Sequence, residues 1–191
     1  RHQCLYAGSC YTGHLHRYAP RTGRVEDLGA LRPDDPHAAC FPCSMDEHPD
    51  GSLYIGSYGH CDLTRFNPAD GQFTRFGRMD PVDMYLYVQC GSDGSVAGLV
   101  HMTRPHVVAL DPRTGERRPV GPVADRQAGE GEVKLIKGSD GRLYIASHAG
   151  NFRIQGLDAV PVPDIPQAPA DAPGVRLPGD RTARFLDADI F

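Results

Sequence analysis

Leu53-Tyr54-Ile55-Gly56-Ser57 decides the fold of this chain, because the chain repeats it. The phrase returns as Leu5-Tyr6-Ala7-Gly8-Ser9 and as Leu143-Tyr144-Ile145-Ala146-Ser147, with a weaker copy at Val96-Ala97-Gly98-Leu99. The copies start 48, 43 and 47 residues apart. A sequence period of this size indicates a repeat architecture.

Two kinds of turn accompany the repeated phrase. Asp-Gly pairs come just before three of its copies, at residues 50–51, 93–94 and 140–141. Pro-x-x-Gly turns follow three of the copies, at residues 20–23, 68–71 and 112–115. The intervening segments are short and rich in β-formers, without sustained helical periodicity. Each repeat therefore predicts four antiparallel strands, which form a blade of a β-propeller. The alternative is a β-sandwich or β-helix in which the spacing is coincidental.

The chain resembles a known group of proteins at two of these motifs. Asp50-Gly51-Ser52-Leu53-Tyr54-Ile55-Gly56 and Asp111-Pro112-Arg113-Thr114-Gly115 are similar to the repeats of a divergent β-propeller family. That family includes streptogramin lyases, gluconolactonase-like proteins and propeller polysaccharide lyases. The resemblance covers roughly residues 1–160. It implies a propeller fold, but it selects no reaction, because propellers host many unrelated activities.

The predicted fold class is all-β. We expect a β-propeller fragment of about three and a half to four four-stranded antiparallel blades, from a larger ring for which seven blades are expected. The blades are predicted at residues 1–35, where the innermost strand is missing, and at 36–79, 80–124 and 125–160. A proline-rich loop or insertion is predicted at 161–180, and the start of another strand at 181–191. Because open terminal blades expose strand edges, we expect a truncated N-terminus and closure by missing blades of the same protein. Closure of a complete small protein by a dimer mate is the alternative.

Composition limits the partners of the chain. Its 191 residues have a net charge of −4, which argues against nucleic acid and anionic membrane surfaces. No apolar stretch reaches the length of about 18 residues that a transmembrane helix needs. The compartment stays open between the bacterial cytoplasm and secretion. Six cysteines include Cys40-Phe41-Pro42-Cys43, for which buried free thiols are the main interpretation, with a disulfide or a metal site as alternatives.

The predicted blade geometry sorts the loops onto two faces. If strands A to D are named from the channel outward, the Asp-Gly turns join A to B and the Pro-x-x-Gly turns join C to D, so both lie on one face. The B–C loops and the crossovers between blades lie on the other face, where propeller enzymes usually hold their ligand; this step rests on fold analogy. The candidates on that face are catalytic His60, His14, Tyr58 and His101, and substrate-binding Arg104, Tyr11, His148 and Arg126. Tyr85 and Tyr87 are further candidates for stacking on a ligand.

These residue types suit proton abstraction beside a carboxylate. Histidine titrates near neutrality and serves as a base, arginine binds a carboxylate through paired hydrogen bonds, and tyrosine protonates a leaving oxygen. The sequence therefore predicts a carbohydrate-active lyase or hydrolase that acts on an acidic saccharide or a related small molecule. No cofactor is predicted and no residue is assigned to a metal, although a divalent metal stays open. The alternative is a non-catalytic propeller that serves as a sensor or protein-interaction module, since repeated histidines also suit a structural role and the chain has no tryptophan to stack on a sugar.

Overall fold

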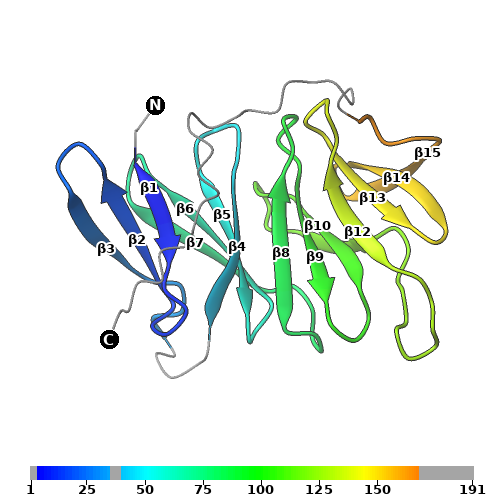
Figure 1. The fold of residues 1–191 in the computed structure, drawn as a ribbon, viewed down its shortest axis with the longest axis horizontal. Coiled ribbons are helices and arrows are strands. Elements are labelled where there is room, and N and C mark those ends of the chain that lie inside the picture. The colour runs from blue at the N-terminus through cyan, green and yellow to red at the C-terminus, as the bar shows by residue number, and fades with distance from the viewer. Residues whose placement is uncertain (1–3, 35–39, 168–191) are drawn as a thin grey trace, which may run out of the picture.

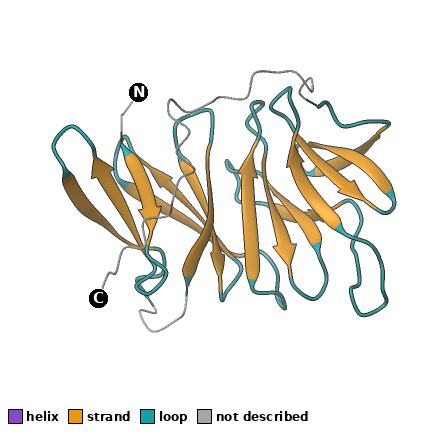
Figure 2. Cartoon of the chain, viewed as in Figure 1, coloured by secondary structure: helices purple, strands orange, loops and turns teal. Residues whose placement is uncertain are grey.

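The computed structural model describes residues 4–34 and 40–167. Every regular element in this part of the chain is a β-strand, and turns and loops join the strands (Figure 2). Among the described residues, none forms a helix that could cross a membrane.

The strands form consecutive antiparallel meanders, numbered here as blades 1 to 4, which stand side by side in chain order (Figure 1). Blade 1 contains β1 (Leu5–Gly8), β2 (His14–Ala19) and β3 (Arg24–Ala30). Blade 2 contains β4 (Phe41–Glu47), β5 (Leu53–Tyr58), β6 (Asp62–Asn67) and β7 (Gln72–Arg78). Blade 3 contains β8 (Tyr85–Cys90), β9 (Val96–His101), β10 (His106–Leu110) and β11 (Arg117–Val120). Blade 4 contains β12 (Val133–Lys137), β13 (Leu143–Ser147), β14 (Gly150–Gln155) and β15 (Asp158–Val162).

The repeated phrase forms a strand that is buried on both faces. In β5, Leu53 and Ile55 pack into a cluster with Leu15 of blade 1, whereas Tyr54 packs on the other side with Leu86 of blade 3. Burying each such side chain contributes on the order of 1.5–3 kcal/mol. Because neighbouring blades cover both faces, the phrase is a continuous apolar run rather than an alternating one.

The repeats also share one cross-strand pair. Tyrosine of the phrase lies opposite an arginine of the following strand in three blades, as Tyr6 and Arg17, Tyr54 and Arg65, and Tyr144 and Arg153. Blade 3 differs, because Ala97 lies opposite Ala109 at this place in the register. Both alanines are buried in the core between blades 3 and 4.

Polar contacts link the first strands of blades 2, 3 and 4. The Ser44 hydroxyl donates to the carbonyl of Leu86 (2.8 Å) and accepts from the amide of Val88 (2.9 Å). The Asp46 carboxylate accepts from the amide of Cys90 (2.8 Å) and pairs with the ammonium of Lys137 (2.7 Å). These contacts fix the relative position of the blades along their innermost strands.

The loops lie on two faces, as the sequence predicts. On one face, the turn after β4 meets the turn after β8 through the His48 ring and the carbonyl of Gly94 (3.2 Å). On the other face, the segment that follows the last strand of a blade is bound to a loop of the same blade: the β1–β2 loop in blade 1, the β5–β6 loop in blade 2 and the β9–β10 loop in blade 3. The amide of Leu31 donates to the carbonyl of Gly13 (3.0 Å), that of Met79 to Cys61 (2.8 Å) and that of Ala124 to Pro105 (2.9 Å).

The proline-rich segment begins later than the sequence suggests. Strand β15 runs through Val162, and Pro161 lies opposite Phe152 in its register. Proline is tolerated there because, within the described part of the chain, β15 pairs only with β14, and an edge strand does not need every N–H group. The strand predicted at 181–191 and most of the predicted loop lie outside the described residues.

The six cysteines are free thiols. Cys40, Cys61 and Cys90 are buried, as expected for small core side chains, whereas Cys10 is exposed. Cys40 and Cys43 of the C-x-x-C phrase form no disulfide. Burial raises the pKa of both Cys61 and Cys90 to about 12, so these thiols stay protonated at neutral pH.

Candidate functional site

A row of four aromatic rings runs along the crossover face of blades 2 and 3. We call Phe41, Tyr58, Tyr85 and Tyr87 the aromatic row. Successive ring centroids lie 5.7, 4.2 and 6.2 Å apart, and each pair is stacked. Tyr58 at the end of β5 lies opposite Tyr85 at the start of β8, which is the single register pair that joins blades 2 and 3 in the described structure. The row therefore forms where two blades meet.

His101 extends the row onto β9. It lies opposite Tyr85 in the register, and its ring meets that of Tyr87 edge-on at 5.9 Å and 84°. An edge-to-face contact of this kind holds the imidazole in one orientation. The histidine is thus positioned by two tyrosines of the neighbouring strand.

Arg126 completes the cluster from the crossover between blades 3 and 4. Its Nη2 lies 2.7 Å from Nε2 of His101. Since a guanidinium is always a donor, Nε2 must offer its lone pair, and His101 is then neutral with its proton on Nδ1. Burial and the neighbouring Arg126 charge lower the pKa of His101, while the carboxylates of Asp83 and Glu132 oppose that effect. A permanent cation therefore lies beside a neutral imidazole.

One tyrosine of the row is held in its protonated form. Burial raises the pKa of Tyr85, and the neighbouring Tyr58 hydroxyl raises it further. Tyr85 therefore stays protonated at neutral pH. Its ring lies between those of Tyr58 and Tyr87, so the row places a phenol close to His101.

His60 lies apart from this cluster. It lines a cavity of about 350 Å³ together with Arg32, Asp62 and Arg78. Arg32 pairs with Asp62 at 3.3 Å. Burial nevertheless raises the pKa of Asp62, because the carboxylate is mostly removed from water. This cavity lies between the first crossover and the outer strands of blade 2.

Arg104 lines a second cavity, of about 250 Å³, in the equivalent place of blade 3. Its backbone amide donates to the buried Asp83 carboxylate (3.0 Å). In the same cavity Nδ1 of His106 donates to the Arg104 carbonyl (2.7 Å), and Nε2 lies 3.5 Å from Asp80. These contacts attach the second crossover to blade 3.

The remaining three candidates are separate from one another. His14 binds the Asp27 carboxylate through Nδ1 (2.8 Å). Tyr11 is 98% exposed. His148 is exposed beside Gly131, where an added Cβ would lie 3.1 Å from the Cβ of the histidine. The structure thus joins Tyr58, His101 and Arg126 through Tyr85 and Tyr87, and it places the other candidates elsewhere on the blades.

The sequence alone indicates no role for Phe41 and marks Tyr85 and Tyr87 only as candidates for stacking on a ligand. The signal for the tyrosines was the alternation Tyr85-Leu86-Tyr87-Val88, which puts both rings on one face of a strand. Leu86 and Val88 are buried on the opposite face. No comparable signal identified Phe41, because its neighbours in the row come from other strands.

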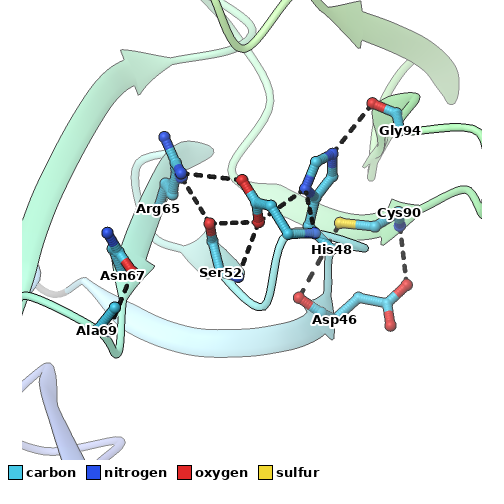
Figure 3. Close-up of polar contacts among 9 residues, drawn as sticks. Asp46, His48, Ser52, Arg65, Asn67, Ala69, Cys90 and Gly94 are labelled. Atoms are coloured by element: carbon cyan, nitrogen blue, oxygen red, sulfur yellow. Dashed lines mark hydrogen bonds and ion pairs between the residues drawn. The ribbon is translucent and has the colours of Figure 1, made fainter.

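Two further features concern the polar side chains outside the cluster. No group of three or more His, Cys, Asp or Glu side chains that could hold a metal is found within residues 4–34 and 40–167. On the opposite face, the Asp50 carboxylate contacts Ser52, Arg65 and His48. Figure 3 shows these three partner side chains together. Burial alone would raise the pKa of Asp50, but hydrogen bonds from Ser52 and the contact with His48 outweigh it and lower the pKa to about 2. This network holds the turn after β4.

Comparison with known proteins establishes the fold. No family model and no curated protein sequence matches the chain. Virginiamycin B lyase from Staphylococcus aureus, solved as a catalytically inactive variant with quinupristin, is 16% identical with a TM-score of 0.58, over 84% of this chain and 53% of that chain. A streptogramin B lyase structure is 16% identical with a TM-score of 0.56, over 84% of this chain and 51% of that chain. The β-propeller domain of Cps50 (Swd1) from Myceliophteria thermophila is 13% identical with a TM-score of 0.54, over 80% of this chain and 48% of that chain.

The chain is therefore an all-β protein with a β-propeller fold. It spans about half the length of these three structures. Identities this low show the fold alone, and the matches include two lyases as well as a propeller domain of another kind. The fold alone selects no reaction, because the function of a propeller depends on the side chains of its site.

Proposed function

We propose that the aromatic row, His101 and Arg126 form a site for a small ring-shaped ligand that bears a carboxylate, of the acidic saccharide class, and that the site acts as a lyase. The contact between the Arg126 guanidinium and the His101 imidazole carries this proposal. An arginine attracts the carboxylate, and a neutral histidine next to it is in the correct protonation state to act as a base.

Each group has one role in the proposed reaction. Arg126 binds the carboxylate and stabilises the enolate-like charge that develops on it. Nε2 of His101 removes the proton on the carbon next to the carboxylate. The C–H electron pair forms a C=C bond, and the bond to the leaving oxygen breaks. Tyr58 or Tyr85 donates a proton to that oxygen, and the proton on His101 returns to the tyrosinate through solvent.

The stacked rings support a cyclic ligand. Tyr87 is 40% exposed, so part of the row is accessible to a ligand. A sugar ring gains van der Waals contact from a flat aromatic surface. The chain has no tryptophan, so in the proposed site the aromatic row supplies that surface. The lyases among the similar structures are consistent with elimination chemistry on this fold.

A screen of uronic acid polymers tests the proposal. Elimination produces an unsaturated product, which ultraviolet absorbance detects. We expect turnover by the chain and a loss of about 100-fold or more in His101→Gln, the usual scale for removing a general base. Tyr58→Phe and Tyr85→Phe identify the acid. His16→Gln is the matched control, because His16 lies on β2, outside the cluster. Undiminished turnover in His101→Gln would refute the assignment.

A second candidate function is a non-catalytic ligand sensor. Its support is that Arg126 already occupies Nε2 of His101, the nitrogen that a base needs. This function predicts saturable binding of glucuronate, measured by calorimetry, with no product formed from any uronic polymer. Binding without turnover would favour the sensor, whereas turnover that depends on His101 would exclude it.

A further inference from the structure

Arg126 makes His101 unavailable as a base in the structure. The lone pair of Nε2 points to the guanidinium at 2.7 Å, and the proton of the neutral ring is on Nδ1. Proton abstraction through Nε2 requires that this hydrogen bond first break. In this arrangement Arg126 therefore blocks the nitrogen of His101 that proton abstraction needs.

We propose that Arg126 is an anion-released latch on His101. In the ligand-free chain the guanidinium occupies Nε2, and a carboxylate that binds Arg126 draws the guanidinium away and frees that nitrogen. The inference rests on the proposed function for the identity of the site, but it concerns how the base is switched on. The ligand class is any small carboxylate whose ring fits the aromatic row.

A carboxylate competes well for the guanidinium. An imidazole nitrogen offers one neutral acceptor, whereas a carboxylate offers two charged oxygens that match the fork of an arginine. Among the described residues, the Arg126 side chain has a hydrogen bond to His101 and is in no ion pair. Most of its N–H groups are therefore available to an incoming anion.

The backbone around Arg126 is fixed, so only the side chain has to move. The Asp125 carboxylate accepts from the amides of Gln127 (2.8 Å) and Ala128 (3.3 Å). The amide of Asp125 donates to Glu130 (2.9 Å), and the carbonyl of Arg126 accepts from the amide of Gly129 (3.3 Å). The loop is a closed turn that presents an exposed arginine.

The other charges near His101 are already engaged. Asp83 accepts from the amides of Thr103 (2.9 Å) and Arg104 (3.0 Å). Glu132 pairs with Lys134 at 2.9 Å. Both carboxylates favour the charged imidazole and Arg126 opposes it. Removing Arg126 from Nε2 while an anion binds nearby therefore shifts His101 toward a stronger base.

NMR titration of the histidine ring nitrogens tests the latch in the intact chain, with His101→Gln used to assign the signal. In wild type we expect glucuronate to raise the pKa of His101, and its uncharged methyl ester to leave it unchanged. Arg126→Gln should raise the pKa without ligand and abolish the response to glucuronate. Arg113→Gln is the matched control, because that arginine is 87% exposed on a turn of the opposite face; it should behave as wild type.

Two results would overturn the latch: a His101 pKa that glucuronate does not move in wild type, or an equal response in Arg126→Gln. Failure of the proposed lyase is a separate result. If the pKa responds as expected and no uronic polymer is cleaved, the latch stands and the reaction is wrong. If polymers are cleaved through His101 but the pKa ignores Arg126, the reaction stands and the latch is wrong.

Discussion

Replacing Gly56 with alanine tests how blade 2 packs against blade 3. Gly56 belongs to the repeated phrase and lies on β5, under the first strand of the next blade. A Cβ at this position would be 3.0 Å from the carbonyl carbon of Leu86, closer still to its oxygen, and 2.5 Å from the Ser44 hydroxyl. Real Cβ atoms almost never approach backbone this closely, so β8 has to move.

The cost follows from what β8 loses when it moves. Ser44 makes hydrogen bonds to Leu86 and Val88 that depend on the present spacing of the strands. Two such bonds are worth about 1 kcal/mol each, and overpacking strain adds about 1–3 kcal/mol. We expect Gly56→Ala to lower the free energy of unfolding by about 3–5 kcal/mol. For a chain of this length, the melting temperature should fall by roughly 6–20 °C.

Thermal and urea unfolding, followed by circular dichroism, measure this cost. The control is Ala146→Gly, which makes the reverse change at the same place of the phrase in blade 4. It should cost no more than about 1 kcal/mol, the usual penalty for glycine in a strand. If the unfolding free energy of Gly56→Ala is within about 0.5 kcal/mol of wild type, β8 does not lie in tight contact with β5 at this position.

Three further outcomes are expected. Asp50→Asn should cost about 1 kcal/mol at pH 7, after allowing for solvent screening of this 44% exposed side chain. Because the pKa of about 2 in the folded chain lies below the ordinary aspartate pKa of 3.8, this stabilisation is present above pH 4 and disappears as the pH falls toward 2. A difference in unfolding free energy that stays constant across that range, measured with urea, would contradict it. Tyr54→Phe should be neutral or slightly stabilising, because its buried hydroxyl has no partner among the described residues, whereas Tyr144→Phe should cost about 1 kcal/mol through the lost bond to a carboxylate; equal melting temperatures for the two variants would refute this. Iodoacetamide should label the exposed Cys10 in the folded chain and spare buried Cys61 until the chain unfolds, and rapid labelling of Cys61 in mass spectra would show that blade 2 opens.

The repeat could be predicted from the sequence because its signal is local. Asp-Gly and Pro-x-x-Gly turns need particular backbone angles, and Gly51, Gly94 and Gly141 all have the positive φ that the turns require. The apolar phrase marks a strand that both neighbouring blades cover. Strand order and the division into two faces follow from these two local facts.

The site could be predicted only in part. Loop position predicts eight candidates on one face with equal weight, whereas the structure connects three of them, Tyr58, His101 and Arg126, through Tyr85 and Tyr87. Which of them meet depends on the stagger between blades, and the register pair of Tyr58 with Tyr85 sets that stagger. No period in the sequence encodes a contact between residues of different blades.

By itself, the sequence determined an all-β repeat, its turns and the division of its loops onto two faces, because periodicity and turn chemistry act over a few residues. Only the tertiary structure decided that His101 is joined to Arg126, and that four rings from three strands form a row beside it. The physical reason is distance along the sequence: the hydrogen bond of Arg126 with His101 and the ring contact of Tyr58 with Tyr85 join side chains 25 and 27 residues apart, and such contacts form only after the strands have packed.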